Sequence, residues 1–84
     1  MGASMISDKR AKKDIAPIGK MKIAGDDGKP KTVGMYEYRY KWQDKDTPKT
    51  RGVMAQELLK KKPSAVNVPG DGSLMSVNYA SLGA

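Results

Sequence analysis

One segment of the chain alternates strictly between aromatic and charged side chains. Between residues 36 and 42 the sequence reads YEYRYKW. A period of two is the repeat of a β-strand, so the aromatic side chains share one face and the charged ones the other. The chain has no Phe, so these aromatics are the largest groups available for a core. The aromatic face consists of Tyr36, Tyr38, Tyr40 and Trp42.

The other elements follow from helix formers and turn residues. Residues 55–62 are helix formers with lysines at the end, and Pro63 ends this helix. We expect it to pack over the aromatic face. Short strands are expected at residues 51–54, 65–68 and 74–79, with a turn at residues 69–72. Residues 7–15 favour a helix start capped by Ser7 or Asp8, and residues 20–32 favour a loop or a loose hairpin.

This order of elements predicts a small α+β domain. The expected fold is a mixed domain in which antiparallel β-hairpins pack on one or two short helices. Only 38% of the 84 residues are hydrophobic, and a core this small often gains stability by oligomerisation. No apolar run approaches the length of roughly 20 residues that spans a bilayer. We therefore expect no membrane partner.

The composition excludes several kinds of active site. The chain contains no His and no Cys, which excludes disulfides, thiol nucleophiles, zinc fingers and His-dependent triads. The acidic residues of the turns lack the spacing of a calcium loop, and Gly70–Gly72 is not followed by a phosphate-binding Lys. We expect neither a metal nor a cofactor.

A chain of this composition can still supply a serine nucleophile with a lysine base. Such a pair needs a lysine whose pKa is lowered by burial or by neighbouring cations, so that its neutral amine accepts the serine proton. Ser7 and Lys12 fit this requirement, because further cations crowd the lysine at positions 9, 10 and 13. As a bare pattern this pair is weak, since Ser and Lys five residues apart are common. A structural role, with Ser7 as a helix cap and Lys12 on a solvated face, stays open.

The net charge of +7 allows a second reading. The basic clusters at residues 9–13 and 60–62 could contact phosphates, and the aromatic face could stack on bases. The alternative is that these lysines are solvated and that the aromatics form the core. We favour the alternative, and a nucleic-acid-binding module remains the minor hypothesis.

Five motifs follow one another along the chain. The first is the block SDKRAK that begins at Ser7, followed by Ile15, and the second is the aromatic strand. The third is GVMAQE, which contributes Gly52, Ala55, Gln56 and Glu57. The fourth is a Pro and a Val, Pro63 and Val66, and the last is MSVNYASL, which contains Tyr79. Taken in this order, the motifs resemble the C-terminal intramolecular chaperone domain of phage tailspikes, tail fibres and endosialidases, which also occurs in the myelin regulatory factor.

The resemblance implies a small α+β domain that trimerises and helps a fibrous protein to assemble. In the members that cleave themselves, the chain is cut just before the Ser of the first block. Carried over to this sequence, the resemblance implies a scissile Ile6–Ser7 bond, with Ser7 as nucleophile and Lys12 as general base. Asp8 and Arg10 are then neighbours that shape the site.

Two departures from the family pattern guide the functional expectation. Only six residues precede Ser7, and the chain ends soon after Leu82 instead of continuing into a long helix. We therefore expect a virion structural or assembly protein that has kept the fold without cleaving. A self-cleaving Ser–Lys autoprotease is the alternative.

The expected partners are phage tail, fibre or neck proteins together with further copies of the chain, most simply as a trimer. The expected location is the virion, after synthesis in the host cytoplasm. The expected organisation is an N-terminal arm (1–6), a chaperone-like domain (7–82) and a short end (83–84). The residues expected at subunit contacts are Met1, Met5, Ile6 and Leu82.

Overall fold

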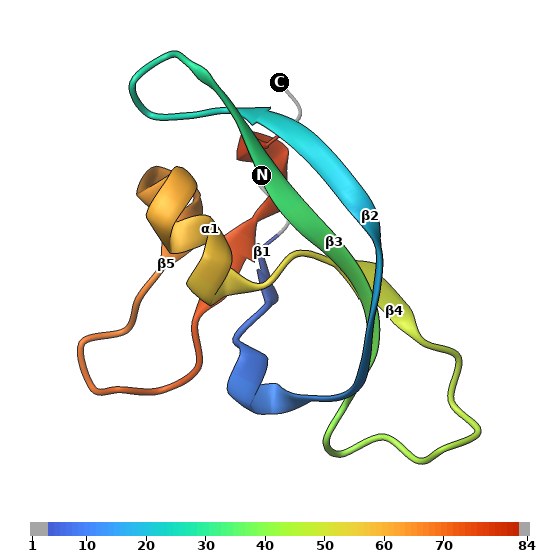
Figure 1. Cartoon of the computed structure of the whole chain (residues 1–84). Helices are drawn as coiled ribbons and strands as arrows, with labels where there is room; N and C mark the ends of the chain where they lie inside the picture. Colours follow the sequence, from blue (N-terminus) through green and yellow to red (C-terminus); the bar gives the residue numbers. More distant parts are fainter. Residues whose placement is uncertain (1–3, 83–84) are drawn as a thin grey trace.

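The computed structural model describes residues 4–82 of the chain, which form two three-stranded antiparallel sheets and one short α-helix (Figure 1). One sheet has the strand order β2-β3-β4 and the other the order β1-β6-β5. This arrangement confirms the predicted α+β class. The elements are β1 (Ser4–Ile6), β2 (Lys12–Ala24), β3 (Pro30–Tyr40), β4 (Thr50–Gly52), α1 (Ala55–Lys61), β5 (Val66–Asn67) and β6 (Ser76–Asn78).

A long hairpin of β2 and β3 extends along the whole molecule (Figure 1). Its turn is confined to residues 25–29, where the Gly25 amide donates to the Lys29 carbonyl and Gly28 adopts a positive φ of 79°. The flanking residues 20–24 and 30–32 belong to the strands, so of the two readings of this segment the hairpin is correct. The helix expected at residues 7–15 is only a 3-10 turn, Lys9–Ala11, and Asp8 is its N-cap.

The main core lies between α1, the hairpin and the sheet of β6. The helix begins at Ala55 as predicted and ends one residue early, at Lys61. Its Leu58 is fully buried and packs against residues of both sheets, and this burial of apolar surface stabilises the arrangement. The buried members of this core are Ile23, Val33, Val53, Ala55, Leu58, Ala65, Met75, Val77 and Leu82.

The aromatic face of β3 is only partly as predicted. Tyr38 and Tyr40 are buried and form a second core cluster with Ala11 and Met54, and Tyr36 reaches α1, where its hydroxyl donates to Glu57. Trp42, however, is 63% exposed. The expectation is wrong for this residue because β3 ends at Tyr40, where the Gln43 side chain accepts the Tyr40 amide proton and the backbone turns.

The residues expected at subunit contacts lie in different surroundings. Leu82 is 6% exposed and belongs to the core, so its assignment to a contact surface is wrong. Met5 and Ile6 are exposed on β1, and Met1 lies outside the described residues. The last three residues of the predicted arm form β1 and pair with β6. Among the described residues, no helix has the length and apolar character needed to cross a membrane.

Candidate active site

Ser7 is fully buried between the two halves of the fold. It follows β1 directly, and its amide donates to the Met75 carbonyl at 3.0 Å, just before β6. Its own carbonyl accepts the Ala55 amide at 2.9 Å, where α1 begins. The hydroxyl donates to the Val53 carbonyl at 2.7 Å. Ser7 is therefore fixed on both sides by backbone contacts with segments far away in the sequence.

Lys12 reaches the Ser7 hydroxyl because the 3-10 turn reverses the chain between them. The lysine is the first residue of β2 and only 3% exposed. Its Nζ donates to Ser7 Oγ at 3.1 Å and to the Val53 carbonyl at 2.8 Å. The prediction of a solvated Lys12 is thus wrong, and so is that of a helix cap at Ser7, because Asp8 occupies the cap. We call Ser7 and Lys12 the dyad.

Burial changes the acidity of Lys12. Desolvation lowers the pKa of its ammonium to about 8, and the charge of Asp8 opposes this shift. About one molecule in ten then carries the neutral amine at pH 7. Burial lowers the pKa of Lys12, and the neighbouring cations do not. Arg10 binds Asp8, and the Lys13 ammonium donates to the Gln43 carbonyl. Within the basic cluster at residues 9–13, Lys12 is buried and is not available to contact a phosphate.

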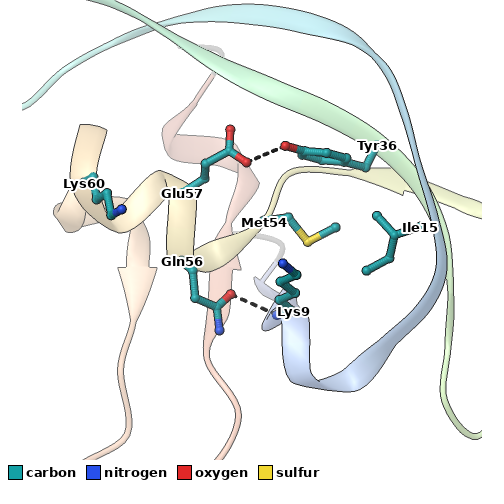
Figure 2. A pocket seen from close by; sticks show the side chains of 7 residues that line it. All are labelled: Lys9, Ile15, Tyr36, Met54, Gln56, Glu57 and Lys60. Atoms are coloured by element: carbon teal, nitrogen blue, oxygen red, sulfur yellow. Dashed lines mark hydrogen bonds between the residues drawn. The ribbon is translucent and has the colours of Figure 1, made fainter.

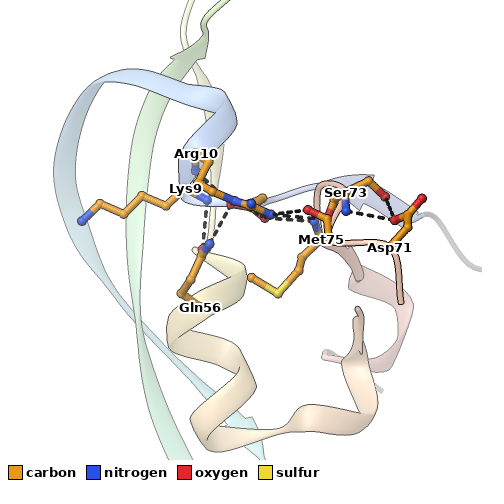
Figure 3. A network of polar contacts seen from close by, with 8 residues as sticks. Lys9, Arg10, Gln56, Asp71, Ser73 and Met75 are labelled. Carbon is orange, nitrogen blue, oxygen red and sulfur yellow. Dashed lines mark hydrogen bonds and ion pairs between the residues drawn. The ribbon is translucent and has the colours of Figure 1, made fainter. Parts of the chain in front are cut away.

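Asp8 locks the segment that carries the dyad. Its carboxylate is fully buried and accepts the Met75 amide at 3.1 Å and the Gln56 side-chain amide at 2.7 Å. Arg10 donates to it from its backbone amide and from two guanidinium nitrogens. These bonds, with the Arg10 side chain first among them, hold the pKa of Asp8 far below its ordinary value. Figure 3 shows Arg10, Gln56 and Met75 converging from three parts of the chain.

The GVMAQE segment wraps around the first block. Besides its bond to Asp8, the Gln56 side chain accepts the Lys9 amide at 2.9 Å. Glu57 turns the other way and accepts the Gly34 amide and the Tyr36 hydroxyl, so it fastens α1 to β3. Two of the motifs singled out in the sequence therefore meet in space, although 48 residues separate Asp8 from Gln56.

Tyr79 completes the surroundings of the serine. Its hydroxyl accepts the Val53 amide at 3.1 Å and lies 3.2 Å from Ser7 Oγ. A side chain at Gly52 would place its Cβ 2.5 Å from this hydroxyl, so only glycine leaves room for Tyr79 to reach the dyad. This close approach gives a physical reason for the glycine that opens GVMAQE.

Two contributors to the site were not predicted. The Tyr38 ring lies under the Lys12 ammonium, 3.9 Å from Nζ, and the Val53 carbonyl accepts from both members of the dyad. The alternation of residues 36–42 indicates which side chains share a face but not which cation lies above them. A backbone carbonyl leaves no sequence signal at all.

The dyad lies against the chain's own backbone. A cavity of about 270 Å³ opens between α1 and the hairpin, but Ser7 and Lys12 are not among its lining residues (Figure 2). Both side chains are also buried, and the peptide carbonyls beside the serine are those of Ile6, its neighbour in the chain, and of Val53, which accepts its hydroxyl proton. A serine with a neutral amine beside it and an adjacent peptide carbonyl has the groups needed for one acyl transfer and hydrolysis.

The chain matches the model of a known protein family. The model of a peptidase family described as the chaperone of endosialidase matches residues 7–67, well over half of the chain. The match begins at the serine of the dyad and confirms the resemblance found in the sequence. Neither the search of curated proteins nor that of solved structures found a match.

Proposed function

Because the chain belongs to the chaperone-of-endosialidase family, we propose that it is an intramolecular chaperone domain that cuts itself once, between Ile6 and Ser7. Domains of this family are typical of phage tail fibre proteins. The observation that supports cleavage is the buried contact of 3.1 Å between Lys12 Nζ and Ser7 Oγ. Assembly of phage tail, fibre or neck proteins is the role we propose for the folded domain, with the virion as its location.

The proposed reaction has two steps. Neutral Lys12 takes the hydroxyl proton of Ser7, and Oγ adds to the carbonyl carbon of Ile6. The C–N bond then breaks, the Ser7 nitrogen receives the proton from Lys12, and an ester joins Ile6 to the serine side chain. Water, activated by the same amine, hydrolyses this ester. The products are a carboxylate at Ile6 and a free hydroxyl and amine at Ser7.

The rate of self-cleavage is expected to rise with pH up to about 8 and then to level off. The reason is that only the neutral amine accepts the proton, and burial lowers the pKa of Lys12 to about 8. Below that value each pH unit changes the neutral fraction by about tenfold. The measurement is to refold the chain at a series of pH values and to quantify the fragment beginning at Ser7 by intact mass. A rate that stays constant between about pH 6 and pH 8 would contradict a role for Lys12 as base.

Assembly is proposed as a property that does not depend on the cut. Domains of this family act in trimeric fibre proteins, and the exposed side chains of Ile18, Trp42 and Val68, which stay with the domain after the cut, offer apolar surface for a contact. We expect the purified chain to have three times the mass of one copy in light scattering. A mass of one copy at all concentrations would contradict the proposed assembly. Repeating the measurement with candidate tail proteins tests the partner.

A further inference from the structure

The carbonyl oxygen of Ile6 is held by a tyrosine. The Tyr40 hydroxyl donates to it at 2.6 Å, and Tyr40 itself is 9% exposed. Neither the sequence motifs nor the composition assigns this tyrosine a role in chemistry. In the proposed reaction this oxygen belongs to the bond that is cut, so the contact falls on a reacting group.

The fold fixes Tyr40 from several directions. Its ring stacks on Trp42 with centroids 4.7 Å apart and meets Tyr38 edge-on at 5.5 Å. Its backbone amide donates to the Gln43 side chain at 2.9 Å. A hydroxyl held in this way is pre-oriented toward its acceptor, which is what a donor to a transition state requires.

The hairpin register relates Tyr40 to the dyad. Tyr40 on β3 is the direct partner of Lys12 on β2, and residues opposite each other in an antiparallel pair extend to the same face. From this one pair of opposite residues, the Lys12 amine contacts Ser7 Oγ and the Tyr40 hydroxyl contacts the Ile6 carbonyl oxygen. These two atoms are the ones whose charge changes when the serine adds to the carbonyl.

We propose that Tyr40 is a catalytic residue of the self-cleavage, an inference that rests on the proposed function. As Oγ bonds to the Ile6 carbonyl carbon, the carbonyl π electrons move to the oxygen, and the Tyr40 hydroxyl stabilises the resulting negative charge while it keeps its own proton. The serine proton goes to Lys12, so the step is balanced. Donors of this kind are worth about a hundredfold or more in rate.

The test compares two tyrosines that each lose a hydrogen-bonded hydroxyl. Tyr40→Phe removes the donor to Ile6, whereas Tyr36→Phe removes the donor to Glu57 on α1. We expect cleavage by Tyr40→Phe to be about a hundredfold slower than that of the wild type, and cleavage by Tyr36→Phe to stay within a few-fold. Thermal unfolding of both variants separates a loss of rate from a loss of fold.

A second readout follows the carbonyl itself. Ile6–Ser7 is the only Ile–Ser pair in the sequence, so labelling Ile carbonyl carbons and Ser nitrogens gives one carbonyl–amide NMR signal for this bond. In the uncut Lys12→Met background, Tyr40→Phe should move the Ile6 carbonyl carbon to lower chemical shift, since a hydrogen bond to the oxygen is lost. Tyr36→Phe should leave the signal in place.

The outcomes distinguish a failure of the role of Tyr40 from a failure of self-cleavage itself. If Tyr40→Phe is cut at the same rate as the wild type, or if the Ile6 carbonyl signal does not move, the catalytic role of Tyr40 is overturned. Neither result contradicts the proposed function. A folded wild type that is never cut contradicts the proposed function, and the catalytic role of Tyr40 with it. Slow cleavage by Tyr40→Phe with an unchanged melting temperature supports the proposal.

Discussion

Replacing Lys12 with methionine is expected to slow self-cleavage by roughly 10²–10⁴-fold, the usual contribution of a general base, while the protein stays folded. Methionine has a similar length and an apolar end, and Lys12 is only 3% exposed. The Val53 carbonyl keeps the Ser7 hydroxyl as a donor, so no buried acceptor is left without a partner. The fragment beginning at Ser7 is quantified by intact mass, and stability is measured by denaturant unfolding.

The stability of the Lys12→Met variant tests whether burial destabilises the charged lysine. Burial lowers the pKa of the Lys12 ammonium to about 8, so below that pH the folded state holds a cation that water would solvate better. The folded protein binds this proton less readily than the unfolded chain, and stability therefore rises with pH from about 8 toward the ordinary lysine value. Lys12→Met removes the buried charge, and we expect equal or greater stability at pH 7.

A neighbouring lysine is the matched control. Lys13 follows Lys12 in β2 but donates to the Gln43 carbonyl, away from Ser7. Lys13→Met should therefore be cut at the rate of the wild type. Two results would contradict the assignment of the base: a Lys12→Met protein that is cut at the normal rate, or a Lys13→Met protein that is slowed just as much.

The second large effect is expected at Asp8. Asp8→Ala should lower the free energy of unfolding by about 3 kcal/mol, because it leaves a buried amide without an acceptor and removes a helix cap. The Met75 amide and the Gln56 side chain both lose their acceptor. Arg10 adds little to the loss, since its side chain is 59% exposed and is solvated without Asp8. Denaturant unfolding measures the change.

The exposed Asp71 is the control for this variant. Among the described residues it accepts from the amide and hydroxyl of Ser73 alone, so Asp71→Ala should cost far less than Asp8→Ala. A loss at Asp8 no larger than at Asp71 would refute the anchoring role. The pKa of Asp8 lies below its ordinary value, so its contribution is present above the unfolded-state pKa near 4 and is lost as the pH falls below it.

Local patterns predicted some elements well and could not predict others. The helix at residues 55–62 was foreseen nearly to its ends because its composition, dipole charges and terminal proline agree. Strand β2 was missed because few of its side chains are buried and it contains Pro17 and Gly19. Pairing with β3 holds this strand together, and irregularities of register next to these two residues accommodate them. A long-range partner of this kind leaves no local periodicity.

The candidate site, too, was predictable from the sequence only in part. Ser7 and Lys12 were singled out because a chain without His and Cys has few other nucleophile–base pairs, and their contact is now described. Their cleavage role remains a proposal. The bond from Tyr40 to the Ile6 carbonyl joins residues 34 apart, and its origin lies in the hairpin register rather than in any motif. Trp42 was misplaced because alternation does not indicate where a strand ends.

The intact mass of the folded chain, measured beside a Ser7→Ala variant refolded in the same way, tests the central claim most directly. Ser7→Ala removes only the hydroxyl, and a wild type that cuts itself should lose residues 1–6 while the variant keeps them. This result would assign the cut to the buried serine beside Lys12. A folded wild type that keeps its full mass near pH 8, where about half of the Lys12 side chains are neutral, would contradict self-cleavage.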